Sequence, residues 1–371
     1  MKFPLHSNIL HAPAWRTRFA PSPTGLLHLG HVASAFHGWA YSRPDGAWLL
    51  RLEDIDPQRC KPEFARAALD DLAWLGLVPD GLVLRQSENM PAYKRTLARL
   101  AGLGVLYPCF CTRADIARES AAMFSAPHTA PDGGLLYSGR CRHLSDAERE
   151  RRMAQGQPYV LRLDMARALE HVRHGHGHGH GHGHGHGHGH GHGHGHGHGH
   201  GHGHGHGHGH GHGHGQMGDC GPDRGANHGA GQGKGAAWPL TYRDLDRGVV
   251  ACRPELFGDV VLARRDVPVS YHLCVTHDDA AQTVTLVTRG EDLRPATDLH
   301  RLLQALMRWP TPAYAFHPLL CDESGRRLSK RDGALSVRAM REAGLTPAQI
   351  LRRAGVGDMP DMLQSTCRRS G

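Results

Sequence analysis

An unbroken alternation of histidine and glycine, from His174 to Gly215, most limits what this chain can fold into. It occupies 42 of the 371 residues and holds 21 histidines and 21 glycines. Every second position lacks a side chain, so the segment can neither build a packed core nor offset the entropy lost on ordering. The sequence as far as about Gly235 is also rich in glycine, which leaves about 300 residues to fold. A substantial core can therefore form from the parts before and after the run.

The same run holds imidazoles at a density that should bind nickel, copper or zinc. Two interpretations stay open. One is a neutral expansion of the repeated tract within a tolerant surface loop, and the other is a segment for metal storage or delivery. Both predict metal binding in vitro, so the pattern does not decide between them.

The rest of the composition narrows the class of protein. The formal net charge of +8 is compatible with a polyanionic partner, and equally with an ordinary basic composition. The N-terminus lacks the pattern of a secretory signal, and no apolar run reaches the roughly 20 residues that span a bilayer. The nine cysteines show no even framework of spacings. We therefore expect a protein of the reducing cytoplasm with no membrane partner.

Hydrophobic periodicity on both sides of the run predicts alternating strands and helices. Apolar or β-branched runs predict strands over Ala47–Leu52 and Thr283–Thr288. Apolar side chains at helical spacing predict helices over His31–Tyr41, Glu63–Leu75, Pro91–Leu103, Asp298–Met307 and Pro347–Ala354. Strands that alternate with helices predict an α/β fold with a parallel sheet and crossover helices.

Two short segments far apart in the sequence have the composition of a nucleotide site. They are Arg18-Phe-Ala-Pro-Ser-Pro-Thr-Gly-Leu-Leu-His-Leu-Gly-His31 and Arg327-Leu-Ser-Lys-Arg331. A helix that begins near Gly30 would point free N–H groups at a phosphate, and His28 and His31 could donate to its oxygens. Lys330 adds a compact cation suited to the charge on a phosphoryl group. Either segment alone is a weak signal, but together they predict a triphosphate site.

This pair of segments resembles the signature motifs of the class I aminoacyl-tRNA synthetases, specifically their glutamyl branch. The blocks that carry the resemblance follow the family's order: Arg18–Gly25, Leu50–Asp54, Asp259–Leu262, Tyr271–Leu273, Arg289–Leu293 and Arg327–Arg331. Within the branch, the short glutamyl-queuosine tRNA(Asp) synthetases are the most similar, because of the length of the chain and a cysteine cluster.

The resemblance implies a Rossmann-like class I synthetase catalytic domain with a zinc-bearing connecting insertion and no anticodon-binding domain. The implied segments are the first half of the catalytic domain (13–105), the connecting insertion (106–170), a low-complexity loop (171–237), the second half of the catalytic domain (238–312), and a lysine loop with a short C-terminal helical segment (313–371). Only 27 residues follow Gly344, where standard glutamyl-tRNA synthetases continue into an anticodon-binding domain.

The resemblance also assigns the ligands of the two small substrates. The implied ATP-binding residues are Thr24, Gly25, His28, Gly30, His31, Ser329 and Lys330, of which His28, His31 and Lys330 are the catalytic ones. The implied glutamate-binding residues are Arg18, Phe19, Ala20, Pro21, Ser22, Glu53, Tyr271 and Arg289. The arginines suit the carboxylates of glutamate, and Glu53 suits its ammonium group. Mg²⁺ would accompany the triphosphate.

A cysteine cluster lies in the implied insertion. Cys109-Phe-Cys111 is followed by Tyr137 and Cys141, and three thiolates with a fourth donor can make a tetrahedral zinc site. The short glutamyl-queuosine relatives carry the same pattern with the tyrosine oxygen as fourth ligand, which implies one structural Zn²⁺ here. Buried free cysteines are the alternative.

The resemblance implies that the chain activates glutamate with ATP and transfers it to the queuosine base of tRNA(Asp). The implied partners are L-glutamate, ATP and queuosine-carrying tRNA(Asp), and we expect a monomer. One alternative is a truncated glutamyl-tRNA synthetase that charges tRNA(Glu). Another is a metal-handling protein that uses the His-rich run.

Overall fold

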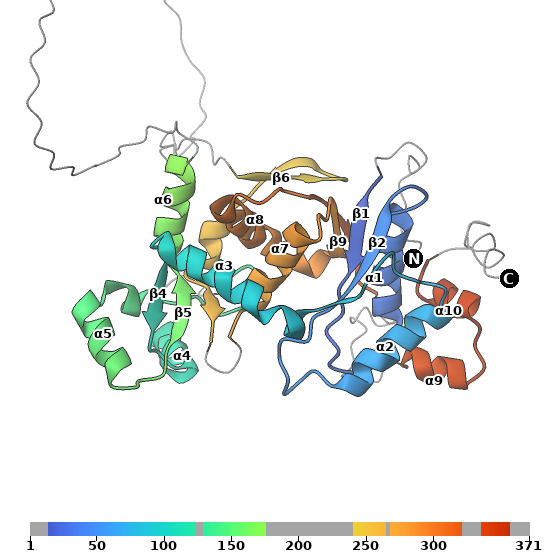
Figure 1. Ribbon diagram of the computed structural model, residues 1–371, viewed down its shortest axis with the longest axis horizontal. Coiled ribbons are helices and arrows are strands. Elements are labelled where there is room, and N and C mark those ends of the chain that lie inside the picture. Colours follow the sequence, from blue (N-terminus) through green and yellow to red (C-terminus); the bar gives the residue numbers. More distant parts are fainter. Residues whose placement is uncertain (1–13, 123–128, 176–239, 265–267, 321–334, 357–371) are drawn as a thin grey trace, which may run out of the picture. The chain divides into compact units, whose positions relative to one another are not determined.

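The computed structural model describes residues 14–122, 129–175, 240–264, 268–320 and 335–356 (Figure 1). Within these ranges, two groups of parallel strands alternate with helices, and other strands form an antiparallel sheet. The parallel strands and their crossover helices confirm the α/β fold that the alternating pattern predicted.

The first group of parallel strands comes from the N-terminal part of the chain. Its elements are β1 (Arg16–Phe19), α1 (Leu29–Tyr41), β2 (Ala47–Leu52), α2 (Pro62–Trp74), β3 (Leu84–Arg85) and α3 (Met90–Gly102). β2 lies between β1 and β3 and is parallel to both. The predicted strand over residues 47–52 and the three helices predicted in this part are confirmed.

The second group comes from the part after the His-Gly run. Its elements are β6 (Thr241–Asp244), β7 (Gly248–Ala251), α7 (Tyr271–Ala281), β9 (Leu286–Gly290), α8 (Ala296–Met307) and β10 (Ala313–His317). β10 is parallel to both β9 and β6, while β6 and β7 form an antiparallel pair.

The strand predicted over residues 283–288 starts and ends later than expected. Thr283 has a φ of 52°, which places it in a turn after α7, and its amide donates to the carbonyl of Ala280 at 3.1 Å. The β-branched run therefore begins as the end of a helix, and β9 continues to Gly290. The predicted helix over residues 298–307 is confirmed within α8.

The two groups of strands meet at β1 and β9. The amide of Thr285 donates to the carbonyl of Arg16 at 2.9 Å, and the amide of Arg16 donates to Thr285 Oγ1 at 2.8 Å across 269 positions of sequence. The carboxyl ends of β1, β2 and β9 are thus brought to one edge, where parallel α/β sheets bind ligands.

Gly38 allows α1 to pack close to this junction. A Cβ at Gly38 would lie 2.9 Å from Thr288 Oγ1 and 3.3 Å from Trp48 Nε1, and the Gly38 carbonyl accepts a hydrogen bond of 2.7 Å from Thr17 Oγ1. The close approach holds α1 against β1, β2 and β9, so its N-terminus is fixed where β1 ends.

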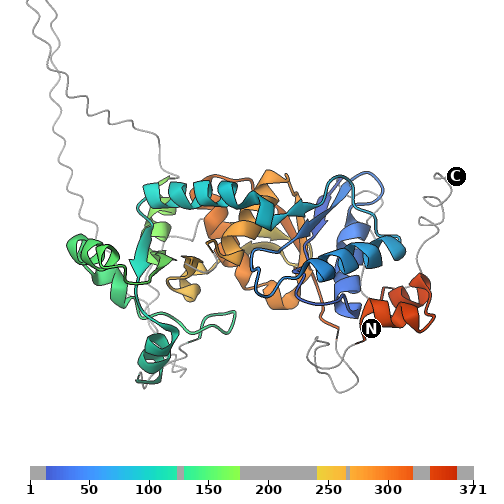
Figure 2. The ribbon, with the colours of Figure 1, turned by 60° about the horizontal axis from the view of Figure 1, so that its bottom comes forward.

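The other elements lie mostly in the segment predicted to be the connecting insertion. They are β4 (Leu106–Cys109), α4 (Arg113–Ala122), α5 (Asp146–Ala154), β5 (Val160–Leu163) and α6 (Met165–Gly175), with β8 (Val261–Ala263) added from the second half. The strand order is β4-β5-β8, and both pairs are antiparallel. Figures 1 and 2 show α4 and α5 near β4 and β5.

Two short helices follow the lysine-containing segment. They are α9 (Val337–Glu342) and α10 (Pro347–Arg353), and α10 confirms the short helix predicted near the end of the chain. The amide of Val337 donates to the carbonyl of Leu27 at 2.8 Å, and Ser336 pairs with His28 in an isolated β-bridge. The chain therefore returns to the start of α1 after residue 334.

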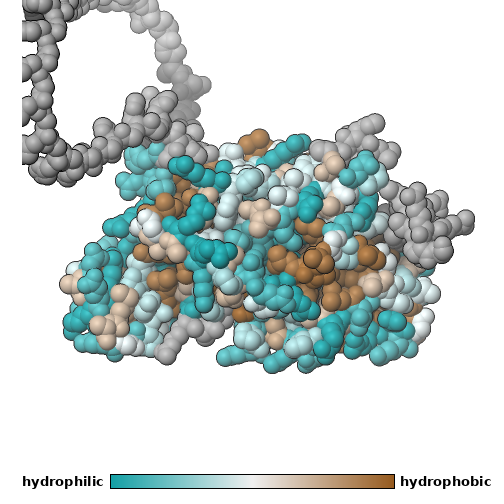
Figure 3. All heavy atoms as spheres, viewed as in Figure 1, coloured by the Kyte–Doolittle hydropathy of each residue, from teal (hydrophilic) through white to brown (hydrophobic). Residues whose placement is uncertain are grey.

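On the face shown in Figure 3, hydrophobic residues gather in patches among hydrophilic ones. Of the helices that the structure describes, none combines the length and the apolar composition needed to cross a membrane.

Candidate active site

The N-terminus of α1 is closed by two histidine side chains. His28 Nδ1 accepts a hydrogen bond of 3.1 Å from the Gly30 amide, and His31 Nδ1 accepts one of 3.2 Å from the His28 amide. The two ring centroids lie 3.9 Å apart. Because both Nδ1 atoms accept, a neutral ring carries its proton on Nε2, which is the donor that a phosphate oxygen could use.

Gly30 makes this arrangement possible. A Cβ at this position would lie 2.9 Å from Cε1 of His28, so a larger residue would displace the ring. Just upstream, the Thr24 amide donates to the Ser22 carbonyl at 2.8 Å, which turns the chain between β1 and α1. Gly25 lies in the same turn, and the turn brings Thr24 to the wall of a cavity.

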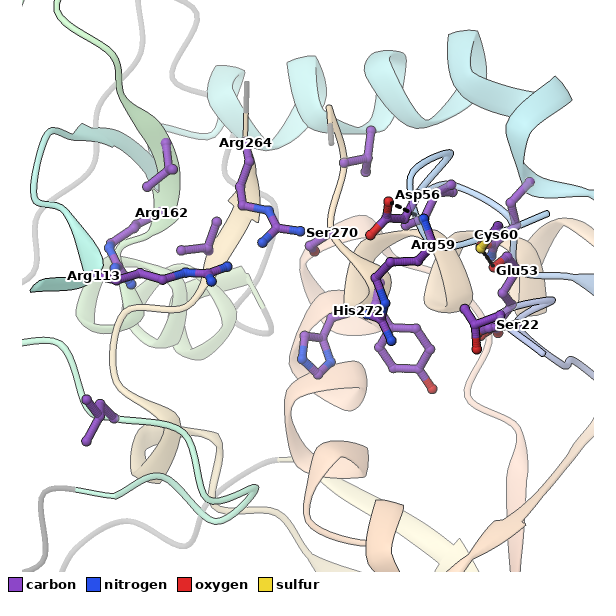
Figure 4. Close-up of a pocket in the computed structure, with 18 of the residues that line it drawn as sticks. Ser22, Glu53, Asp56, Arg59, Cys60, Arg113, Arg162, Arg264, Ser270 and His272 are labelled. Atoms are coloured by element: carbon purple, nitrogen blue, oxygen red, sulfur yellow. Dashed lines mark hydrogen bonds between the residues drawn. The ribbon is translucent and has the colours of Figure 1, made fainter. Parts of the chain in front are cut away.

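A cavity of about 620 Å³ lies at the carboxyl edge of the strands (Figure 4). Four of the predicted substrate ligands line it: Ser22, Thr24, Glu53 and Tyr271. In Figure 4, Ser22, Glu53 and Cys60 lie on one side of the cavity, and Arg113 and Arg162 of the connecting insertion lie on the other. The cavity therefore extends from the predicted glutamate ligands to the insertion.

Glu53 follows β2 directly and is held by the turn after β1. Its amide donates to the carbonyl of Pro21 at 3.0 Å, and Ser22 Oγ donates to its carboxylate at 3.5 Å. The residue is 8% exposed. Burial raises the pKa of Glu53 to about 7, although the charges of Arg51 and Arg18 oppose the shift. A cation that binds beside this buried carboxylate would stabilise its ionised form and lower its pKa.

Arg18 is paired inside the protein with an aspartate that the sequence did not point to. Its Nε donates to Asp279 Oδ1 at 2.8 Å, and its Nη1 donates to the Thr288 carbonyl at 3.1 Å. Arg51 Nη2 donates to the same Asp279 oxygen at 2.7 Å. Burial alone would raise the pKa of Asp279, but the two arginines outweigh it and lower the pKa to about 2. The carboxylate is therefore ionised between two buried guanidinium groups.

The neighbouring Asp278 extends this buried network to α3. It accepts hydrogen bonds of 2.8 Å from Gln86 Nε2 and from Tyr93 Oη, and its side chain is fully buried. Arg51 is a charged residue inside the mostly apolar strand over residues 47–52, and this position in the sequence could have marked it as a buried charge. The partners of Arg51 could not be identified from the sequence, because they lie more than 200 positions away.

Arg289, near the end of β9, is 4% exposed. Its Nη1 lies 3.2 Å from His300 Nδ1, and its Nε has no hydrogen-bond partner among the residues that the structure describes. Burial raises the pKa of Tyr271 to about 12, with Glu53 acting in the same direction and Arg289 and Arg18 opposing. Arg18 and Arg289 thus influence the Tyr271 hydroxyl, but neither is among the residues that line the cavity.

The other predicted glutamate ligands, Phe19, Ala20 and Pro21, lie at the end of β1 and directly after it. The Phe19 ring is buried and stacks on Trp48, with ring centroids 6.5 Å apart, so its side chain belongs to the core. Ala20 is half-buried, and Pro21 is buried and contributes its carbonyl to Glu53.

The predicted metal ligands come together in the connecting insertion. The sulfur atoms of Cys109, Cys111 and Cys141 all lie within 4.8 Å of one another, and Tyr137 Oη lies 3.5 Å from Cys111 Sγ. Zinc–sulfur bonds of about 2.3 Å put the sulfurs of a tetrahedral site about 3.8 Å apart, so these donors could hold such an ion. A hydrogen bond from Cys109 lowers the pKa of Cys141 to about 4, which favours a thiolate.

Ser329 and Lys330 lie outside the described residues. The structure therefore does not place the second predicted ATP segment. It does place Ser336, six positions after Lys330, in the bridge with His28.

Comparison with known proteins identifies the family. The model of the catalytic domain of class I tRNA synthetases (E and Q) matches residues 14–174 and 235–369. The glutamyl-Q tRNA(Asp) synthetase of Rhodobacter capsulatus is 38% identical over 345 residues, which cover 92% of this chain and 99% of that protein. The glutamate–tRNA ligase of Aquifex aeolicus is 31% identical, over 90% of this chain and 55% of that protein.

Among solved structures, a glutamate tRNA ligase from Elizabethkingia meningosepticum in complex with its amino acid aligns with a TM-score of 0.62 at 23% identity. The alignment covers 92% of this chain and 60% of that one, and at this identity it supports the fold alone. The family match and the identity to the curated relatives go further. The chain belongs to the class I tRNA synthetases of the glutamyl and glutaminyl type, a family of ligases.

Proposed function

We propose that this protein activates glutamate with ATP and transfers it to the queuosine base of tRNA(Asp). The observation that carries the proposal is the cavity lined by Ser22, Thr24, Glu53 and Tyr271, four residues of the predicted substrate site. The choice of acceptor follows the similarity to the glutamyl-Q tRNA(Asp) synthetase of R. capsulatus, which this chain matches over nearly its whole length.

The charges around the cavity match those of glutamate. Glu53 takes the ammonium group, and binding of that cation favours the ionised form of its carboxylate. Among the described residues Arg289 Nε has no hydrogen-bond partner, and we assign it to a carboxylate; Arg18 is held by Asp279 and acts mainly through its charge. Ser22 and Tyr271 line the cavity and would provide hydroxyl groups to the substrate.

Adenylate formation breaks the bond between the α- and β-phosphates while a carboxylate oxygen of glutamate bonds to the α-phosphorus. Pyrophosphate leaves with the bonding electrons, so catalysis consists of positioning and of stabilising charge. His28 and His31 would donate from Nε2 to the triphosphate, which Mg²⁺ would accompany and partly neutralise. Thr24, Gly25 and Gly30 would let the nucleotide approach the backbone.

Lys330 and Ser329 complete the proposed site. The proposal for Lys330 is supported by Ser336, which follows it by six positions in the sequence and pairs with His28 in the isolated β-bridge. The lysine would stabilise the charge on the α-phosphate.

We also propose a structural Zn²⁺ on Cys109, Cys111, Cys141 and Tyr137. The ion would tie the end of β4 to the turn over Arg140–His143 and so shape the insertion side of the cavity. The chemistry it supplies is coordination alone, since all four positions are filled by the protein.

The acceptor is tested by incubating the protein with labelled glutamate, ATP and either queuosine-containing tRNA(Asp) or the same tRNA without queuosine. We expect label only with the modified tRNA. Purified tRNA(Glu) is the matched control for the alternative of a truncated glutamyl-tRNA synthetase, and equal labelling of tRNA(Glu) would refute our choice of acceptor.

Deletion of residues 174–215 distinguishes the metal-handling alternative from the proposed function. Our proposal expects unchanged glutamate activation in the shortened protein. A loss of nickel or zinc tolerance in cells carrying the deletion, with activation intact, would instead assign the run its own function.

A further inference from the structure

Three side chains from three elements form a hydrogen-bonded chain beside the cavity. Arg289 of β9 lies 3.2 Å from His300 Nδ1 of α8 through its Nη1. His300 Nε2 in turn lies 3.1 Å from His272 Nδ1 of α7. His300 is 2% exposed, so both of its ring nitrogens are committed to these partners inside the protein.

The donor and the acceptor of each hydrogen bond in this series follow from Arg289. A guanidinium group only donates, so His300 Nδ1 must accept. A neutral His300 then carries its proton on Nε2 and donates it to His272 Nδ1. A neutral His272 must accept there, which leaves its own proton on Nε2.

Charge and burial keep both rings neutral. Burial lowers the pKa of His272 to about 4, with Asp132 opposing the shift and Arg289 adding to it. Burial and the neighbouring Arg289 lower the pKa of His300 well below its usual range. Protonation of either ring would also place a donor against a donor.

His272 is the last member of this hydrogen-bonded series and lies at the cavity. Its side chain lines the cavity next to Tyr271, and Figure 4 shows it between the Glu53 side and the insertion side. The fixed tautomer therefore presents an N–H group, not a ring acceptor, from this part of the wall.

We propose that His300 is a positioning residue for the amino-acid substrate, which holds Arg289 in place and sets His272 as a neutral Nε2–H donor. Arg289 is 4% exposed and is not among the cavity-lining residues, so His272 is the member of the three that faces the cavity. A substrate carboxylate there meets an N–H donor, whereas the NH₂ group of an amide would set a donor against a donor. The inference rests on the proposed function for the identity of the substrate, but its proton assignment stands without it.

The proton assignment is tested first on the full-length protein. Long-range ¹H–¹⁵N spectra distinguish the two neutral tautomers and the imidazolium form, and difference spectra against His272→Gln and His300→Gln identify the two rings among the 34 histidines. We expect Nε2–H tautomers for both at pH 7. An Nδ1–H tautomer or an imidazolium at either position would overturn the inference, whatever the protein's substrate.

The positioning role is tested with two substitutions of His300. Gln can accept from Arg289 and donate to His272, whereas Leu fills a similar volume and can do neither. We expect His300→Leu to raise the KM for glutamate by about tenfold, because it leaves buried donors and acceptors unpaired. His300→Gln should restore most of the affinity, and the KM for ATP should stay the same in both variants.

Discrimination between glutamate and glutamine separates positioning from simple loss of structure. We expect His300→Leu to reduce the preference for glutamate over competing glutamine, since the wall is no longer made of fixed donors. Equal weakening of both ligands, or no rescue by His300→Gln, would overturn the positioning role. A wild-type protein that activates neither amino acid would refute the proposed function while leaving the spectroscopic result intact.

Discussion

At the scale of single residues, the protonation of Glu53 should make substrate binding depend on pH. Its carboxyl group is buried against the end of β2, and its pKa lies near 7 instead of the usual value near 4.5. In the proposed function, the ammonium group of glutamate binds the ionised form of this carboxylate. Protonation of Glu53 below pH 7 would then compete with substrate binding.

We predict that kcat/KM for glutamate falls as the pH is lowered through 7, by about tenfold per unit well below that value. Pyrophosphate exchange between pH 5.5 and 8.5 measures it. Glu53→Gln should give a low rate that no longer depends on this titration. A wild-type profile that is flat across this range would show that Glu53 does not bind the amine.

Asp279 is a second residue whose contribution to stability can be predicted from its contacts. It forms buried ion pairs with both Arg18 and Arg51, and the side chains of Asp279, Arg18 and Arg51 are 6%, 8% and 0% exposed. Removing one partner of a buried ion pair leaves a charge that water cannot reach.

We predict that Asp279→Asn lowers the free energy of unfolding by about 3 kcal/mol or more. Chemical denaturation measures it. Glu88→Gln is the control, because Glu88 is 74% exposed and lies 3.8 Å from Arg85, and it should change the stability little. Similar stabilities for the two variants would contradict a tight Arg18–Asp279–Arg51 network.

At the scale of elements, α1 links the core to the site. Its apolar face packs on the sheet through Gly38, and its N-terminus carries the two imidazoles. A methyl group at Gly38 would push the helix away from Thr288 and Trp48.

We predict that Gly38→Ala destabilises the protein by about 1–3 kcal/mol, through overpacking that exceeds the gain in helix propensity. Gly102→Ala is the matched control, since a Cβ there meets nothing within 4 Å. It should leave the melting temperature unchanged or slightly higher. A stabilised Gly38→Ala variant would mean that α1 can move off the sheet at no cost.

The thiol cluster makes the insertion a second testable element. In protein lacking residues 174–215, we predict about one zinc per chain and its loss in Cys141→Ser, because three sulfurs and a phenol suit one tetrahedral ion. Elemental analysis measures the content. Cys60→Ser is the control, because Cys60 lies outside the cluster, and it should keep the metal. Equal zinc in the two variants would refute the site.

Much of this element structure could be predicted from the sequence. The strand over residues 47–52 is an uninterrupted, mostly apolar run, and the helices over residues 31–41 and 298–307 repeat apolar residues at helical spacing, so local pattern determines them. The start of β9 could not be predicted, since Thr283 and Leu286 both belong to a β-favouring run. Thr283 adopts a turn conformation because α7 ends just before it, and this is seen only in the structure.

The site could be predicted only in part. Family motifs placed Ser22, Thr24, Glu53 and Tyr271, and these share one cavity. Asp279 and His300 were not foreseen, because each matters through a partner in another element, and no local pattern shows that Arg51 meets Asp279 across 228 positions. Ser329 and Lys330 stay predictions.

At the scale of the whole molecule, one core is built from both sides of the His-Gly run. Leu49 and Tyr93 from the first half pack in the same buried cluster as Leu273 and Leu299 from the second. The cavity likewise takes Glu53 from one half and Tyr271 from the other. Neither half alone contains the site.

The hydrogen-bonded junction of β1 with β9 implies that the peptide link between the halves is dispensable once they have met. Two polypeptides, 1–175 and 240–371, produced in the same cell should assemble and purify together, and the complex should carry out pyrophosphate exchange. Each expressed alone should aggregate, because it exposes an apolar surface and an unpaired strand edge. Failure of the two fragments to complement each other would show that continuity through the repeat is needed for folding.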